Sequence, residues 1–121
     1  MDPRQKLPDA SHPITVTPTG KRVVVELDGT VIADTTDALT LQESTYPAVQ
    51  YLPVAAVDAA VLRGSDHHTY CPFKGEADYF HLGREGELKN SIWIYRAPYD
   101  AVAEIKDHVA FYPDKVTITI G

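Results

Sequence analysis

The sequence lacks the features that mark several protein classes. Its 121 residues contain one cysteine, which excludes an internal disulfide and a zinc cage built from several cysteines. Lysine and arginine number 11 against 17 acidic residues, and the net charge of −6 disfavours nucleic-acid or anionic-membrane binding, since phosphate neutralisation needs clustered cations. No apolar run approaches the roughly 18–20 residues of a membrane span, and residues 1–6 lack the apolar core of a signal peptide. We therefore expect a cytoplasmic protein with neither nucleic acid nor membrane as partner.

The length fits one domain, and 44% hydrophobic residues are enough to build a core. Residues 1–13 are polar and contain three prolines, which predicts an extended N-terminal arm. Residues 14–121 are predicted to form a single β-rich domain.

Short strands dominate the predicted domain. Asp28-Gly29 separates two valine-rich runs and indicates a two-residue hairpin, because both turn positions need positive φ. A helix is predicted over 54–62, where valines recur at helical spacing after Pro53, and one or two helical turns over 99–106. The predicted fold class is therefore mainly β (α+β). Short strands at this spacing are typical of an antiparallel sandwich or open barrel. The predicted strands cover 14–17, 21–27, 30–35, 38–43, 77–82 and 91–96, followed by a final hairpin of 109–112 and 115–120.

The unusual residues gather in the stretch Thr69 to Phe80, which holds the lone cysteine, a proline, a lysine and a glycine. Together with Trp93-x-Tyr95-x-x-Pro98 and the run Ile105 to Tyr112, its Cys-Pro-x-Lys-Gly motif resembles the bacterial domain-of-unknown-function 427 family. The resemblance covers roughly residues 22–120. It implies a small fold of two antiparallel sheets that lean together like a tent. Relatives of this architecture often carry a zinc knuckle, which one cysteine does not supply, and some cage small ligands between aromatic side chains.

Cys71 and Lys74 are the candidate catalytic residues. A lysine close to a thiol favours the thiolate, so Cys71 is a candidate nucleophile or redox thiol. A free cysteine is also often a small buried hydrophobe. Lys74 lies beside Gly75 at an expected loop tip, where its ammonium would bind a carboxylate or phosphate or would remain solvated.

Aromatic residues supply the candidate binding surface. Trp93 and Tyr95 share one face of a strand while Ile92 and Ile94 share the other, which is the natural core face. The aromatic face would line a groove over the Cys71–Lys74 turn and suit a planar polar ligand. The alternative is a cross-strand aromatic cluster that stabilises the sheet. The residues expected to contact a ligand are Glu43, Tyr51, Lys74, Tyr79, Trp93 and Tyr95.

Metal and nucleotide chemistry are disfavoured. His67 and His68 are adjacent and would point to opposite faces of a strand, so we expect no metal site and no cofactor. Gly64-Ser65 followed by Glu76 and Asp78 faintly matches a nucleotidyltransferase pattern. That chemistry needs a helix starting at the Gly-Ser to hold phosphates, and the proline-containing turn leaves no room for one.

Three functions remain open from the sequence. We favour a module that binds an unknown small polar or anionic molecule in the aromatic groove. An enzyme with Cys71 as nucleophile is the second option. A structural or interaction domain, with a second copy of the chain as one partner, is the third.

Overall fold

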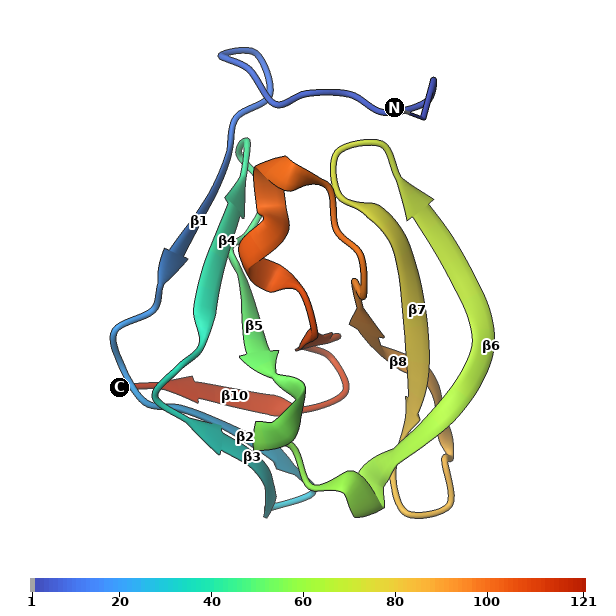
Figure 1. Cartoon of the computed structure of the whole chain (residues 1–121). Coiled ribbons are helices and arrows are strands. Elements are labelled where there is room, and N and C mark those ends of the chain that lie inside the picture. The colour runs from blue at the N-terminus through green and yellow to red at the C-terminus, as the bar shows by residue number, and fades with distance from the viewer. Residues whose placement is uncertain (1) are drawn as a thin grey trace.

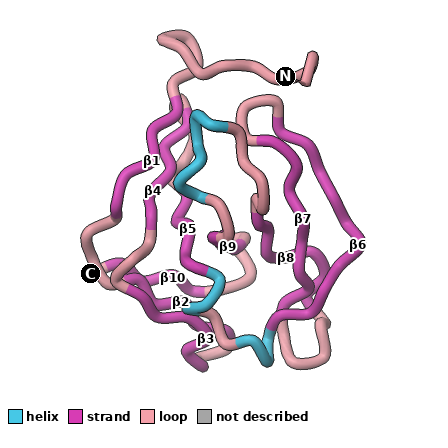
Figure 2. The backbone as a smooth tube through the Cα atoms, in the orientation of Figure 1, coloured by secondary structure: helices cyan, strands magenta, loops and turns pink. Residues whose placement is uncertain are grey.

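The computed structural model describes residues 2–121, and strands make up most of it, as the sequence predicts (Figures 1 and 2). These residues form two antiparallel sheets that do not close into a barrel. The strands are β1 (Ile14–Pro18), β2 (Val23–Leu27), β3 (Thr30–Thr35), β4 (Leu39–Glu43), β5 (Val49–Pro53), β6 (Leu62–Cys71), β7 (Gly75–Leu82), β8 (Leu88–Ile94), β9 (His108–Phe111) and β10 (Thr117–Ile120).

The larger sheet has seven strands in the order β1-β4-β5-β9-β8-β7-β6, and the smaller has the order β10-β2-β3. Figure 1 shows β1, β4 and β5 on one side of the larger sheet and β6, β7 and β8 on the other, with the smaller sheet at the lower end of the molecule. This open, tent-like arrangement is the predicted architecture. Among the described residues, no helix has the length and apolar character needed to cross a membrane.

The Asp28-Gly29 hairpin forms as predicted. Leu27 pairs with Thr30 across the turn, and the two turn residues have φ values of 50° and 83°. Both values are positive, as the tight turn between β2 and β3 requires.

The predicted hairpin of 109–112 and 115–120 is wrong. β9 instead pairs with β5 and β8 in the larger sheet, whereas β10 pairs with β2 in the smaller one. Val109, Ala110 and Phe111 are all buried, so both faces of β9 are covered. A strand covered on both faces belongs in the middle of a sheet, and burial there outweighs the local turn signal at Pro113-Asp114.

The helix predicted over 54–62 takes the form of two single 3-10 turns, η1 (Val54–Ala56) and η2 (Ala59–Val61). Val57 between them is extended and forms a bridge with Ala33, and the Asp58 N–H donates to the Ile32 carbonyl at 2.8 Å. Pairing with β3 therefore interrupts the helix. Leu62 already belongs to β6, a strand that the sequence did not predict.

The second predicted helical segment is present as η3 (Asp100–Ile105), which buries Val102 and Ile105. In Figure 1 it lies between the two sides of the larger sheet.

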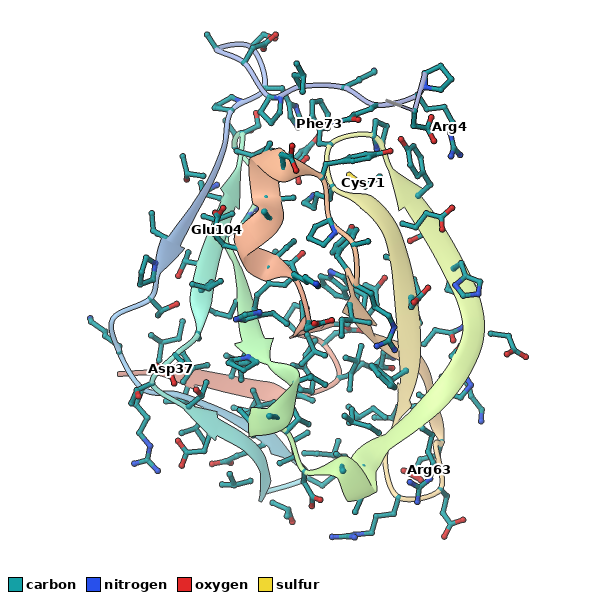
Figure 3. The ribbon with its side chains drawn as sticks, in the orientation of Figure 1. Arg4, Asp37, Arg63, Cys71, Phe73 and Glu104 are labelled. Atoms are coloured by element: carbon teal, nitrogen blue, oxygen red, sulfur yellow. The ribbon has the colours of Figure 1, made fainter. Side chains whose placement is uncertain are left out.

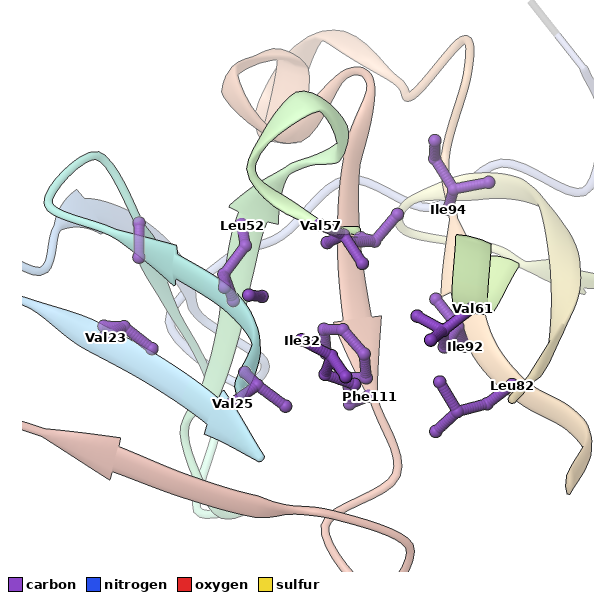
Figure 4. Packing of buried hydrophobic residues seen from close by; sticks show 13 residues of the cluster. Val23, Val25, Ile32, Leu52, Val57, Val61, Leu82, Ile92, Ile94 and Phe111 are labelled. Atoms are coloured by element: carbon purple, nitrogen blue, oxygen red, sulfur yellow. The ribbon is translucent and has the colours of Figure 1, made fainter. Parts of the chain in front are cut away.

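Two clusters of buried side chains hold the fold together, and β8 contributes to both. Ile92 and Ile94 lie in the inter-sheet core (Figure 4), while Tyr95 and the partly buried Trp93 pack in a second cluster with η3. The predicted alternation of aliphatic and aromatic faces is thus confirmed. We call the second cluster the aromatic core; its buried members are Leu41, Tyr51, Ala77, Tyr79, Tyr95, Val102, Ile105 and Ala110.

Candidate functional site

A cavity of about 380 Å³ opens beside the aromatic core. β4 and β5 form one wall, β7 and β8 another, and the turn between β6 and β7 adds Lys74. All six residues predicted to contact a ligand line this one cavity. The lining residues are Leu41, Glu43, Tyr46, Pro47, Val49, Tyr51, Lys74, Tyr79, Trp93, Tyr95 and Tyr112.

The β6–β7 turn holds Lys74 in a defined position. The Lys74 N–H donates to the Cys71 carbonyl at 3.2 Å, and the Lys74 carbonyl accepts from the Tyr99 N–H at 3.0 Å. Gly75 follows with a φ of +110°, where a side chain would be strained, and an added Cβ would lie 3.5 Å from the Ala97 carbonyl oxygen. The turn is thus pinned on both sides of the lysine.

The Lys74 ammonium turns inward although its backbone lies at a loop tip. Lys74 is buried, and its Nζ donates to Glu43 Oε1 in an ion pair. The side chains of Lys74 and Glu43 are 11% and 15% exposed. The pair links β4 to the β6–β7 turn, and the two residues face the cavity together.

Glu43 has a second partner on its other oxygen. His12 Nε2 lies 2.8 Å from Glu43 Oε2. Burial alone would raise the pKa of Glu43, but the hydrogen bonds from Lys74 and His12 outweigh that effect and hold the pKa below its usual value. Glu43 is therefore a carboxylate at neutral pH.

His12 is a site residue that the sequence analysis missed, because it lies in the predicted arm. The Asp9 side chain accepts hydrogen bonds from the backbone N–H groups of Ser11 and His12, at 2.9 and 3.2 Å, and so shapes a turn. The imidazole stacks on Phe73 with ring centroids 4.2 Å apart. Figure 3 shows Phe73 and Cys71 at the β6–β7 turn beneath the arm, whose Lys6 N–H donates to the Pro72 carbonyl at 2.9 Å. An aspartate two residues before a serine is a turn signal that could have indicated this geometry.

The cavity wall combines aromatic faces with hydroxyl groups. Trp93 Nε1 donates to the Tyr51 hydroxyl at 3.1 Å, and the Tyr79 hydroxyl pairs with Thr69 at 2.9 Å. The ring of Tyr112 lies 4.8 Å from that of Trp93. Tyr95 is 6% exposed, and its hydroxyl has no hydrogen-bond partner among the described residues.

The buried tyrosines remain protonated at neutral pH. Burial is the main cause that raises the pKa of Tyr51 and the pKa of Tyr95 well above the ordinary value of a phenol. Each therefore keeps an O–H that can donate. The Tyr51 oxygen already accepts from Trp93, which leaves its hydrogen available.

Cys71 lies close to Lys74 but outside the set of residues that line the cavity. Its sulfur is 3.8 Å from Lys74 Nζ, and its half-buried side chain packs against the aromatic core. The two candidate catalytic residues are thus neighbours, and only Lys74 of the two faces the cavity.

The residues considered for metal and nucleotide chemistry are placed elsewhere. Among residues 2–121, no three His, Cys, Asp or Glu side chains gather in a way that could hold a metal ion. Gly64 and Ser65 belong to β6, so no helix begins there. Asp78 is paired with His68 at 2.7 Å and with Arg96 at 3.0 Å on the other side of the hairpin.

A protein-family model described as a domain of unknown function, DUF427, matches residues 15–120. No curated protein matches the sequence.

Proposed function

The chain belongs to the DUF427 family, and because this description names no activity, we propose from the cavity itself that the protein binds a small polar or anionic molecule. The ligand would lie between the aromatic walls with its polar group toward Lys74. The expected contacts are Glu43, Tyr51, Lys74, Tyr79, Trp93 and Tyr95.

One observation carries this proposal: hydrogen-bond donors without protein partners face an aromatic cavity. The Tyr95 hydroxyl has no partner among the described residues although its side chain is almost fully buried. Among the described residues no buried side-chain N or O atom lacks a hydrogen-bond partner, so the Tyr95 hydroxyl is open to the cavity, where it can donate to a ligand acceptor. Lys74 adds one donor, since an ammonium has three N–H bonds, of which one donates to Glu43 and another to Cys71 Sγ at 3.8 Å.

The walls suit a flat molecule. Tyrosine and tryptophan rings offer stacking and edge contacts to a planar ligand. The volume of about 380 Å³ lies within the range of roughly 300–1,000 Å³ typical of small-molecule sites. A few polar groups in an otherwise apolar wall fix orientation, which is the common design of such sites.

A broad panel of metabolites, screened by thermal shift, tests the proposal. Trp93 is the single tryptophan of the chain, so its indole N–H gives one resonance in a ¹H–¹⁵N spectrum and reports directly on the cavity. We expect hits that raise the melting temperature and move this resonance, with weaker binding to Tyr95→Phe. Hits that leave the indole unmoved, or a panel without hits, would contradict the proposal.

An enzyme with Cys71 as nucleophile is the second candidate, and the 3.8 Å separation of its sulfur from Lys74 Nζ favours it. Attack would need a substrate to reach the thiol from outside the cavity, because Cys71 is not among the lining residues. We also propose a bacterial cytoplasm as the setting, where a lone thiol stays reduced.

A further inference from the structure

We infer that the cavity selects its ligand by charge: it takes a neutral or singly charged acceptor group and rejects a doubly charged phosphate, with Glu43 as the residue that sets the limit. This inference rests on the proposed function and narrows the class of ligand.

The charges around the cavity sum to zero. Of its lining residues, Lys74 is the one cation and Glu43 the one carboxylate, and they form an ion pair. The other lining side chains are neutral aromatic or aliphatic groups. The hydrogen bonds from Lys74 and His12 keep Glu43 ionised, so its negative charge faces any anion that approaches the lysine.

Among residues 2–121, no second cation lines the cavity to offset a second negative charge. Arg4 and Arg96 border a different hollow, beyond the β6–β7 turn, and each is paired with its own carboxylate. His12 contacts Glu43 from the side of the N-terminal arm and does not line the cavity. A dianion would therefore share a single lysine with Glu43.

The free-energy cost of burying an anion rises faster with its charge than the attraction that the cavity residues can supply. Removing an ion from water costs several kcal/mol in a protein, and in a Born treatment the cost grows with the square of the charge. A buried charge is tolerated when it is paired and hydrogen-bonded. A monoanion or a carbonyl would be paired with Lys74 and hydrogen-bonded by the hydroxyls of Tyr51 and Tyr95, whereas a dianion would keep one unpaired charge.

Three matched probes test the inference: benzoate, benzamide and phenyl phosphate. All three carry one phenyl ring and fit within the cavity, and at pH 8 their charges are −1, 0 and −2, since the second phosphate pKa is near 6. Titrations would follow the Trp93 indole resonance. We expect benzoate or benzamide to bind the wild-type protein at least tenfold more tightly than phenyl phosphate, which corresponds to about 1.4 kcal/mol.

The variant Glu43→Gln tests whether the charge of Glu43 causes the weaker binding of the dianion. The amide keeps the shape and an acceptor for Lys74 but removes the negative charge. We expect phenyl phosphate to bind this variant at least tenfold more tightly than wild type, while benzamide affinity changes less than twofold. Glu104→Gln is the control, because Glu104 is exposed on η3, outside the cavity, and loses the same formal charge (Figure 3).

The outcomes separate the inference from the proposed function. If the metabolite panel gives cavity ligands but phenyl phosphate binds wild type as tightly as benzoate and benzamide, the charge rule is overturned and the proposed function stands. The same holds if Glu43→Gln and Glu104→Gln change phosphate affinity equally. Should Glu43→Gln fail to fold, the wild-type ratio of the three probes still decides. If neither panel nor probes move the indole resonance, both the proposed function and the inference are contradicted.

Discussion

Replacing Glu43 with glutamine should destabilise the fold by about 1–3 kcal/mol at pH 7. Breaking a fully buried ion pair from one side costs roughly 3–5 kcal/mol. The Glu43 and Lys74 side chains retain 15% and 11% exposure, and the amide oxygen still accepts from the ammonium, so we reduce that figure. Urea unfolding followed by the fluorescence of Trp93 measures the change, with Glu104→Gln expected within about 0.5 kcal/mol of wild type.

The pH dependence identifies charge as the cause. The pKa of Glu43 in the folded state lies below its usual value, because the hydrogen bonds from Lys74 and His12 outweigh burial. A depressed carboxyl pKa stabilises the fold above the unfolded pKa, and the contribution is lost as pH falls through the folded pKa. The stability gap between wild type and Glu43→Gln should therefore close as the pH falls below the ordinary glutamate pKa of 4.5 and through the lower pKa of the folded state. A gap that persists under acid, or no gap at pH 7, would refute the reasoning.

Three further predictions concern the turn, the arm and the thiol. Gly75→Ala should lower the free energy of unfolding in urea by about 1–3 kcal/mol, because Gly75 has a φ of +110°. Gly64→Ala is the control: an added Cβ there meets open space and the residue has no left-handed φ, so the loss should be less than about 1 kcal/mol. Equal losses would contradict the strain argument. His12→Ala removes the bond to Glu43 and the stack on Phe73, so trypsin should cleave within residues 2–13 several-fold faster than in wild type, and an unchanged rate would show that the arm is held by other contacts. Cys71 should react with iodoacetamide at least tenfold more slowly in the native protein than in urea because it is half-buried, and a native rate equal to or above the unfolded rate would favour the enzyme hypothesis.

Local signals in the sequence were enough to predict most of the strands, though not β5 or β6, and the faces that the residues of β8 show. The Asp28-Gly29 hairpin depends on two adjacent residues that tolerate positive φ, and it forms as expected. Alternation along β8 separated Ile92 and Ile94 from Trp93, because side chains in a strand point to opposite faces whatever the neighbouring strands are. This alternation is also why the aromatic residues predicted to contact a ligand surround one cavity.

Contacts between distant residues explain what the sequence analysis missed. Valines at helical spacing indicated a helix at 54–62, but Val57 pairs with Ala33 in β3, a partner that local periodicity does not reveal. Lys74 was expected at a loop tip, and its inward turn depends on Glu43, 31 residues away. His12 is likewise held in position by Glu43 and Phe73, which are distant in the sequence. The composition of the proline-rich polar arm therefore did not indicate that His12 belongs to the site.

Chemical-shift mapping of the ¹⁵N-labelled protein during titration with the strongest hit of the metabolite panel tests the binding proposal most directly. We expect the Trp93 indole N–H and the backbone amides of Lys74 and Gly75 to shift together with one dissociation constant, and Tyr95→Phe to weaken all three responses equally. Shifts confined to residues away from the cavity, with the indole and the β6–β7 turn unchanged at saturation, would contradict it.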